Sequence, residues 1–413
     1  MGIRIGGNIE KVNAKELSYS EFVLKYMEKN QPVVMMGLMD DWKACKDWVF
    51  DNGKPNLQFF STHFGNSRVQ VADCGTKEFT DQKRVEMSVS EFVDRWLENS
   101  MEEQSSASTN LSYGDHVLYL KDWHFVKGLG LLFMLMFSGH IVGQQMNMKG
   151  SVYNIFDDVS EKEFPGFKEA IWLECTQEQN EIIFVPSGWY HQVHNLEDTI
   201  SINHNWFNAY NLSWVWNLLL RDYDEAKEYI EDIRDICDDF EGLCQRNLAA
   251  NTGMNFNDFY FVLAHFCLAN VVELCCLRRN CENSIHSSSL VAQHLAMNLR
   301  SVRKTVLEIE SVGGLDGNCG IFLDIRETLD DPSFLNLCTG LERVYGMIHK
   351  LKSGDIDTRK DLVDDLMDLD SIRTNGSQVF KAEELVIFID KAIAKLGGTN
   401  GDEIDLLSER DGA

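Results

Sequence analysis

The stretch EIIFVPSGWYHQVHNLEDTISINHNWF, residues 181–207, decides the predicted fold. Its first apolar run, residues 182–185, is followed by Pro186-Ser187-Gly188, which predicts a strand and then a turn. A second strand is predicted from Trp189 onward, a turn at residues 195–198, and a third strand over residues 199–206. In that third strand Ile200 and Ile202 face one way, and the polar residues between them face the other. One apolar and one polar wall are typical of a barrel that encloses a small polar pocket.

His191 opens the second predicted strand directly after the turn. A neutral histidine in this place can point its ring into the mouth of a barrel and bind a metal. The alternative is a hydrogen-bonded structural histidine, and the spacing alone does not separate the two. His194 lies beside the next turn, and His204 falls on the isoleucine side of its strand, so neither is expected to be a ligand.

The segment GWYHQVHNLEDTISINHNW, residues 188–206, resembles the distal strand pair of the jumonji-C (JmjC) family of iron- and 2-oxoglutarate-dependent oxygenases. QPVVMMGLMDDW, residues 31–42, and FGNSRVQVADC, residues 64–74, resemble the opening of the same family. Together the resemblance covers about residues 5–220. Within this family the chain most resembles the jumonji-domain protein four group, and this resemblance implies a lysyl hydroxylase acting on a translation termination factor.

The resemblance implies a cupin-like double-stranded β-helix with Fe(II) as cofactor and 2-oxoglutarate and O2 as cosubstrates. Such enzymes hold iron with two histidines and one carboxylate on one face of the metal. His191 matches the later histidine ligand. Asn203 matches a strand position whose side chain faces 2-oxoglutarate in related enzymes. The implied partner is a protein substrate.

The other two iron ligands are absent from the sequence. In the family they form a His-x-Asp or His-x-Glu pair, yet none of the 11 histidines is followed two residues later by Asp or Glu. His140 lies in the matching region, but Val142 occupies the carboxylate position. The chain is therefore expected to bind iron poorly, and its barrel is expected to be incomplete.

Residues 128–146, GLGLLFMLMFSGHIVGQQM, stand where this pair belongs. Codons exist for this stretch whose shifted frame encodes TWTPLHADVFRSYSWSAN, which contains His-Ala-Asp and resembles the family's proximal strand. We therefore predict that residues 128–150 are a frame-shifted or mis-spliced segment. The alternative is an authentic buried strand or helix turn of an unrelated insert.

The predicted class is α+β, with an oxygenase domain over residues 1–215 and a helical region over residues 216–396. Within the first domain, residues 99–114 are predicted to form a polar loop, and residues 397–413 a flexible acidic tail. The other predictions of secondary structure are helices at 15–29, 56–65, 88–98, 211–237, 256–277, 287–310, 335–352, 358–370 and 380–396, and strands at 33–36, 68–72 and near 116–120.

The net charge of -27 excludes a general affinity for nucleic acid or for anionic membranes, because such a surface repels phosphates. It attracts basic protein segments, or it only keeps the chain soluble. No apolar run is expected to reach the roughly 18–20 residues of a membrane span. The sequence shows no signal peptide, and its 11 cysteines are irregularly spaced, so a reducing, cytoplasmic location is predicted.

Three rival functions remain open at this point. As alternatives to the protein hydroxylase, the chain is a non-catalytic JmjC-like binding module, an unstable splice or gene-model product, or a cupin-like binder of small molecules. A zinc site at Cys275, Cys276, Cys281 and His286 is disfavoured because no C-x2-C pair is present, and buried core cysteines are expected there.

Overall fold

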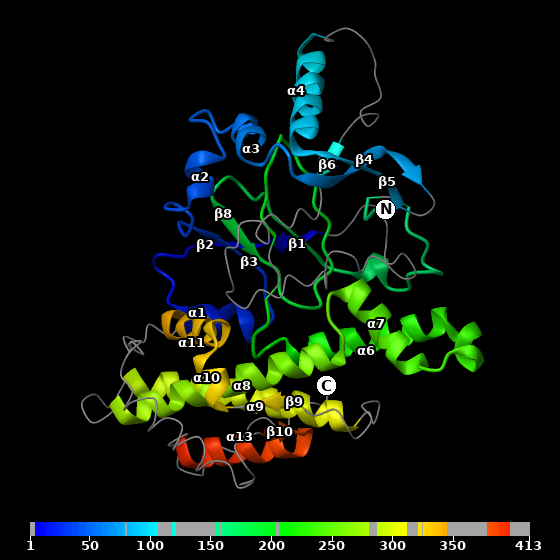
Figure 1. Cartoon of the computed structure of the whole chain (residues 1–413). Helices are drawn as coiled ribbons and strands as arrows, with labels where there is room; N and C mark the ends of the chain where they lie inside the picture. The colour runs from blue at the N-terminus through cyan, green and yellow to red at the C-terminus, as the bar shows by residue number, and fades with distance from the viewer. Residues whose placement is uncertain are drawn as a thin grey trace. The chain divides into compact units, whose positions relative to one another are not determined.

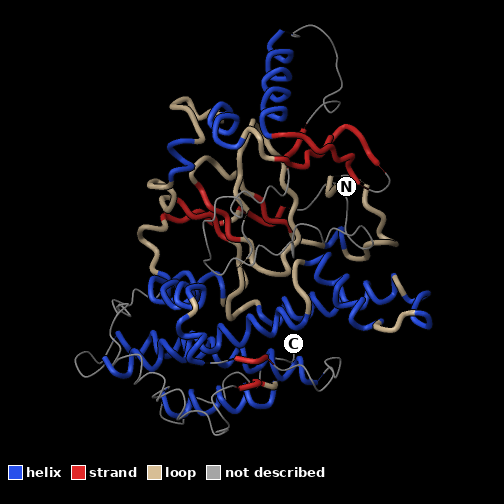
Figure 2. The backbone as a smooth tube through the Cα atoms, in the orientation of Figure 1, coloured by secondary structure: helices blue, strands red, loops and turns tan. Residues whose placement is uncertain are grey.

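The computed structural model describes part of the chain, and these residues form two compact units. One unit comes from the described residues up to 203 and the other from those after 205 (Figure 1). Strands and helices mix in the first unit, whereas the second is mostly helical (Figure 2), so the predicted α+β class is confirmed. The described residues are 5–78, 81–105, 118–120, 154–156, 158–203, 206–280, 287–311, 321–323, 325–344 and 378–396.

A three-stranded sheet in the first unit contains the strand that leads to His191. Its order is β2 (Glu10–Asn13), β3 (Val33–Met36), β8 (Glu181–Phe184), with β3 parallel to β2 and antiparallel to β8. Val33 in the central strand is fully buried, as expected for an unbroken apolar run. The predicted strands at 33–36 and 182–185 are confirmed.

A short helix packs against this sheet. It begins with α1 (Tyr19–Phe22) and continues as a π-helical turn, η1 (Val23–Met27). The Phe22 ring meets the Phe184 ring edge to face, with 5.1 Å between centroids. The helix predicted over 15–29 is therefore confirmed for residues 19–27.

A second, antiparallel sheet has the order β5 (Asp81–Ser88), β4 (Arg68–Glu78), β6 (Leu118–Leu120). Helices α3 (Leu57–Phe64) and α4 (Val89–Ser105) supply the rest of its core. The predicted helices at 56–65 and 88–98 are confirmed, as are the predicted strands at 68–72 and near 116–120, which are β4 and β6. β5 was not predicted. The smaller elements of this unit are β1 (Ile5–Asn8) paired with β7 (Trp172–Glu174), α2 (Lys43–Asp47) and η2 (Phe167–Glu169).

The polar loop predicted over 99–114 is wrong at its start, because α4 continues to Ser105. Residues 99–105, NSMEEQS, contain neither proline nor glycine, and Met, Glu and Gln favour a helix. The Ser100 hydroxyl donates to the Trp96 carbonyl at 3.0 Å, which satisfies it within the helix. Residues 106–114 lie outside the described part of the chain.

The chain after β8 departs from the prediction. The turn at residues 186–188 is present: Gly188 has φ 87°, and the Trp189 amide donates to the Pro186 carbonyl at 3.3 Å. The second and third predicted strands are wrong for the described residues 189–203, which are loop and turn. β8 ends the sheet order β2-β3-β8, and none of the described residues after it pairs with its other edge, so the alternating pattern alone does not create a ladder.

The predicted apolar wall of the third strand is also wrong in part. Ile200 packs against the core under β4 and β5, but Ile202 is 48% exposed. Without a pleated strand the two isoleucines do not share one face.

Helix α9 lies at the centre of the second unit, packing against α8, α13 and α6 (Figure 1). The predicted helices at 256–277, 287–310 and 380–396 are confirmed. The helix predicted over 211–237 is an α-helix only as far as Tyr229. The helix predicted over 335–352 is confirmed up to Val344, where the described residues end. The predicted helix at 358–370 and the tail at 397–413 lie outside the described residues. The elements of this unit are α6 (Leu212–Tyr229), η3 (Glu231–Ile236), α7 (Phe240–Thr252), α8 (Phe256–Asn280), α9 (Ser287–Ser311), β9 (Ile321–Leu323), α10 (Ile325–Asp330), α11 (Pro332–Val344), β10 (Gln378–Phe380) and α13 (Ala382–Leu396).

Helix α8 corrects one expectation about membranes. Its stretch Phe256–Leu277 is long and apolar enough to cross a bilayer, although no such run was expected. Inside the unit, however, 83% of that window is buried. A buried core helix also has this length and composition, and the buried side chains of α8 belong to the core of the helical unit.

Candidate metal centre

His191 lies on the loop that follows β8 and the Gly188 turn, and its side chain is exposed. Its Nδ1 atom is 3.4 Å from the carbonyl oxygen of Trp189. Metal-binding histidines commonly donate one ring N–H to a carbonyl, which leaves the other nitrogen for the metal. Among the described residues Nε2 of His191 has no hydrogen-bond partner, so this nitrogen is the one available to a ligand.

His194, three residues further on, is engaged differently. Its Nε2 atom is 2.6 Å from Nε2 of Gln192, and its ring centroid is 5.2 Å from that of Phe156. Because an amide nitrogen only donates, His194 Nε2 accepts this bond and its lone pair is used. The geometry therefore makes His191 the better ligand of the two. His204 lies outside the described residues.

Asn203, predicted to face 2-oxoglutarate, is exposed near the end of the same loop. No hydrogen bond or ring contact of the described residues joins it to His191. The extended strand that would have turned its side chain toward a pocket is absent at residues 199–203. The structure thus shows no hydrogen bond or ring contact between the two predicted site residues, both of which are exposed.

No group of three His, Cys, Asp or Glu side chains able to hold a metal occurs within the described parts of the chain. His140 and Val142 lie outside those parts. The family that the sequence resembles holds iron with two histidines and a carboxylate. The donor set around His191 is one exposed imidazole, so the described residues do not fit the iron that the sequence resemblance implies.

Two other described histidines have structural roles. His63 and His265 each place Nδ1 2.9 Å from the carbonyl of the residue four positions earlier in their helix. Each ring also lies against the phenylalanine at that earlier position, Phe59 or Phe261. Burial lowers the pKa of His265, which keeps it neutral in the helical unit. Neither lies in a group of potential metal ligands.

The predicted core cysteines are partly confirmed. Cys275 on α8 is 1% exposed and Cys276 is half-buried, while Cys281 and His286 lie outside the described residues. A buried thiol in an apolar helix packs as a small hydrophobic side chain.

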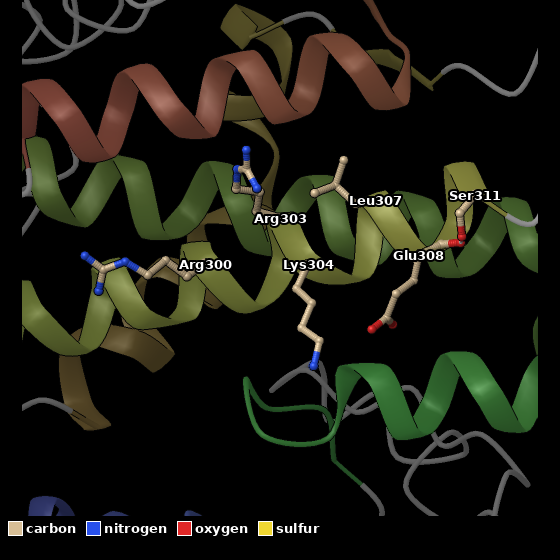
Figure 3. A pocket seen from close by; sticks show the side chains of 6 residues that line it. All are labelled: Arg300, Arg303, Lys304, Leu307, Glu308 and Ser311. Atoms are coloured by element: carbon tan, nitrogen blue, oxygen red, sulfur yellow. The ribbon is translucent and has the colours of Figure 1, made fainter. Parts of the chain in front are cut away.

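A groove along α9 was not predicted (Figure 3). Arg303 forms a bidentate pair with Asp390 of α13, with N–O distances of 2.7 and 3.1 Å. Glu308 accepts a weak hydrogen bond from Ser213 at 3.4 Å. The charged groups here are mainly cations from a single helix, so this groove has no metal-binding chemistry. Its lining residues are Arg300, Arg303, Lys304, Leu307, Glu308 and Ser311.

Comparison with known proteins identifies the chain's relatives. Residues 143–206 match the family model described as JmjC domain, hydroxylase. An Arabidopsis thaliana protein named arginine-specific demethylase JMJ20 is 44% identical over 94% of this chain and 97% of its own length. The Danio rerio 2-oxoglutarate and iron-dependent oxygenase JMJD4 is 30% identical, over 59% of this chain and 71% of its own length. A Caenorhabditis briggsae protein named bifunctional arginine demethylase and lysyl-hydroxylase psr-1 is 23% identical over 52% of this chain and 65% of its own length.

Two features of these matches concern the anomalous stretch. The family model begins to match at residue 143, so it includes His191 and Asn203 but not residues 128–142. The alignment with JMJ20 spans 466 positions, more than the 413 residues of this chain, so that relative contains segments that this chain lacks. The resemblance predicted from residues 188–206 is confirmed, and the near-complete match to JMJ20 shows that the chain belongs to the JmjC family.

Proposed function

We propose that this chain corresponds to an Fe(II)- and 2-oxoglutarate-dependent protein hydroxylase, and that the chain as written binds iron too weakly to catalyse. The observation that carries the proposal is the environment of His191. A single exposed imidazole, with no second or third ligand beside it among the described residues, replaces the expected triad. The first half of the proposal rests on family membership, and the second half on this geometry.

The missing ligands decide the outcome because divalent iron is bound weakly by any one nitrogen donor. When iron, 2-oxoglutarate and O2 are held together, they supply an oxidant able to hydroxylate a C–H bond. His191 contributes one bond to that assembly. Asn203 would contact 2-oxoglutarate only in a chain whose residues 199–206 form a strand.

The proposed substrate is a basic side chain of a protein, with a lysine of a translation termination factor as the first candidate. The lysine is implied by the sequence resemblance. The names of JMJ20 and psr-1 add arginine demethylation as an alternative. Lysine and arginine share a cationic side chain, and a net charge of -27 favours approach of a basic segment. A cytoplasmic location belongs to the same proposal.

The proposed cause of the defect is the segment at residues 128–150. A shifted frame that encodes TWTPLHADVFRSYSWSAN would supply the missing His and Asp in the order that the family uses. The start of the family match at residue 143 and the extra segments of JMJ20 both support this account. The incomplete barrel is a further part of the proposal.

A second candidate function is a non-catalytic binding module or an unstable product. The observation that favours it is the exposure of large apolar side chains on the His191 loop: Tyr190 is 79%, Val193 76% and Leu196 78% exposed. Large apolar side chains that lie this exposed in one short loop are typical of an interaction surface or of a tendency to aggregate.

The test compares this chain with a variant in which residues 128–146 are replaced by TWTPLHADVFRSYSWSAN, and with one that carries the whole corresponding segment of JMJ20. Anaerobic titration with Fe(II) measures binding, and succinate formation measures turnover. We expect no stoichiometric iron in the chain as written and one iron in at least one replacement variant. His191→Ala in that variant is the matched control and should abolish the gain.

Iron binding or succinate formation by the unmodified chain would contradict the proposed defect. Failure of both replacement variants, if they are folded, would contradict the proposed site. The nucleotide sequence tests the cause directly, because codons for residues 128–146 that do not encode TWTPLHADVF in another frame rule out the frame shift. Matched peptides containing lysine or methylarginine separate the substrates: one gains an oxygen atom, and the other loses a methyl group.

A further inference from the structure

Two large apolar side chains between α6 and α7 are almost fully exposed. Tyr229 ends α6 and is 87% exposed, and Ile236 ends η3 and is 82% exposed. Ile230 packs against the core of the helical unit, so this segment is anchored while the two side chains face solvent. Among the described residues no other large apolar side chain is exposed as far. Exposed aromatic side chains on a well-packed unit are typical of protein–protein interfaces.

The segment that presents these side chains is strongly acidic. It runs from the last turns of α6 through η3 to the start of α7 (Figure 1), and residues 221–241 contain ten carboxylates and three cations, a net charge of -7. Each cation pairs with a carboxylate of the same segment, at N–O distances between 2.6 and 3.6 Å, and Asp239 pairs with Arg246 at 3.0 Å. The other six carboxylates are exposed and form no ion pair or hydrogen bond with a described residue: Asp224, Glu225, Glu228, Asp232, Asp235 and Asp238.

The geometry of η3 separates its paired charges from its unpaired ones. A 3-10 helix has three residues per turn, so residues three apart share a face. Glu231 and Arg234 share one face, where they pair at 2.6 Å, and the guanidinium lies 4.2 Å from the centre of the phenylalanine ring that begins α7. Asp232 and Asp235 share the next face, and both are exposed. Ile236 follows directly, so unpaired carboxylates accompany the exposed apolar side chain.

Tyr229 has similar surroundings on α6. Glu225 precedes it by four residues, so the two side chains are neighbours on the helix surface, and Glu228 lies on the same side. Both glutamates are exposed. A cation that pairs with Glu225 can also approach the face of the Tyr229 ring, which attracts positive charge.

Charge decides which partner this surface fits. A second copy of the chain would bring the same negative charge to it, and nucleic acid and anionic membranes are repelled in the same way. The described residues contain no group of three carboxylate, histidine or cysteine side chains able to hold a metal ion. A basic polypeptide segment with some apolar side chains matches both the carboxylates and the two exposed apolar residues.

We infer that the α6–η3 surface docks a basic, partly apolar segment of another protein. The inference rests on the proposed function only in identifying that protein with the basic substrate, because docking itself needs no iron. The surface is formed by Glu225, Glu228, Tyr229, Asp232, Asp235 and Ile236.

The first test measures binding of a fluorescein-labelled peptide of Arg-Lys-Leu-Gly repeats to the chain as it is, by fluorescence anisotropy. A peptide with glutamine in place of arginine and lysine is the control probe. We expect the basic peptide to bind with a Kd that rises as salt is added, because salt screens exposed charges. The glutamine peptide should bind much more weakly, and equal binding of the two peptides would contradict the inference.

Asp232→Asn combined with Asp235→Asn tests the charges. We expect the Kd to rise by about fivefold and to depend less on salt, as for the loss of two exposed ion pairs. Glu310→Gln combined with Glu383→Gln, at exposed carboxylates of α9 and α13, changes the net charge equally and is the matched control. It should change the Kd by less than about twofold. An equal loss in the two double variants would mean that overall charge, and not this surface, attracts the peptide.

Tyr229→Ser combined with Ile236→Ser tests the apolar contacts. We expect the Kd to rise by about tenfold at every salt concentration, because salt hardly screens an apolar contact. Leu307→Ser combined with Ile387→Ser, at side chains that are 38% and 46% exposed, should leave binding unchanged. All four side chains are exposed, so circular dichroism should show the same helical signal in both variants.

Unchanged binding in both surface variants would overturn the inference. Sedimentation tests the other occupant: if Tyr229→Ser combined with Ile236→Ser abolishes self-association of the chain, a second copy covers this surface and the inference is wrong.

The docking surface and the proposed function can fail separately. Peptide binding that depends on the α6–η3 surface, together with replacement variants that bind no iron, would refute the proposed function alone. In a replacement variant that forms succinate, Tyr229→Ser combined with Ile236→Ser should raise the KM for a basic peptide and leave kcat unchanged. An unchanged KM there would refute the docking surface and leave the proposed function intact.

Discussion

At the residue scale, Asp222 on α6 is a carboxyl group whose burial has a cost in free energy. Its side chain is 11% exposed, and burial raises its pKa to about 6, although Arg221 nearby opposes the shift. An acid with a raised pKa in the folded state stabilises that state below its unfolded value of 3.8. This contribution is lost as the pH rises through 6, because the buried carboxylate must then carry its charge.

Asp222→Asn should therefore stabilise the protein above pH 6 and have less effect at pH 4.5. The expected gain in the free energy of unfolding at pH 7.5 is about 1 to 2 kcal/mol, since each pKa unit corresponds to about 1.4 kcal/mol and partial solvation reduces the full value. Urea unfolding followed by circular dichroism at the two pH values measures it.

Asp224→Asn is the matched control for this prediction. Asp224 is exposed on the same helix, so its replacement removes the same charge without relieving any burial. An equal gain in both variants would show that the effect is relief of the overall negative charge, and the account of Asp222 would then be wrong.

The site could be predicted from sequence only in part. His191 was found because a short, specific segment surrounds it, and the absence of a His-x-Asp pair is a fact of the sequence itself. The attachments of its loop could not be found, because the Trp189–Asn30 hydrogen bond joins residues 159 positions apart. The distinction between His191 and His194 likewise depends on which ring nitrogen meets a donor, and no pattern of residue types records that.

At the element scale, the capping of α1 gives a stability prediction. Ser18 Oγ accepts from the Glu21 amide at 3.2 Å, and the Glu21 carboxylate accepts from the Ser18 amide at 3.0 Å. Removing one side of such a capping box costs about 1 kcal/mol. Ser18→Ala should lower the urea midpoint of the first unit accordingly. Ser20→Ala, inside the same helix, is the control, and an equal loss there would contradict the role of the cap.

Leu299 tests the core of the helical unit. It is fully buried on α9, whereas Leu307 on the same helix is 38% exposed. Leu299→Ala should destabilise this unit by about 2 to 5 kcal/mol through lost burial and the cavity left behind. Leu307→Ala should cost less than about 1 kcal/mol. Thermal unfolding monitored by circular dichroism compares the two, and similar losses would mean that α9 is not packed as described.

The difference between local and non-local interactions explains which helices and strands could be predicted from the sequence. Helical periodicity is local, so the patterns at 256–277 and 287–310 suffice to locate α8 and α9. The strand at 33–36 was also recognisable, because a short apolar run predicts a buried strand, and its consecutive residues Val33 and Val34, which face opposite sides, are both fully buried. The strands expected over 189–206 are absent from the described residues 189–203 because pairing is not local: the alternation is present, but these residues join none of the described sheets.

At the scale of the whole molecule, the two units differ in the size of their cores. The helical unit has one large continuous cluster of buried side chains from α6 to α13, and the core under β4 and β5 is much smaller. Limited digestion with chymotrypsin should therefore cut the first unit first, at exposed sites such as Tyr190 and Leu196. Mass spectrometry should find a resistant fragment that begins after about residue 196 and retains α6 to α9. Early loss of these helices would contradict the predicted order.

The exposed apolar side chains lead to a last prediction about the chain in solution. Tyr190, Val193 and Leu196 lie within seven residues, and each is more than 75% exposed. Native proteins seldom leave such a cluster uncovered, and the edges of open sheets add to the tendency to associate. The chain should therefore bind the dye ANS under native conditions and form aggregates as its concentration rises.

Val193→Ser combined with Leu196→Ser should lower both ANS fluorescence and light scattering without changing the helical circular dichroism signal. Leu307→Ser, at an exposed leucine of the helical unit, should change neither. If the segment at 128–150 is what deprives this loop of its neighbouring strands, the replacement variant that binds iron should show the same loss of ANS binding with Val193 and Leu196 intact. Strong ANS binding by an iron-loaded replacement variant would show that the missing iron ligands and the exposed apolar loop have different causes. The iron site would then have been restored without covering the loop.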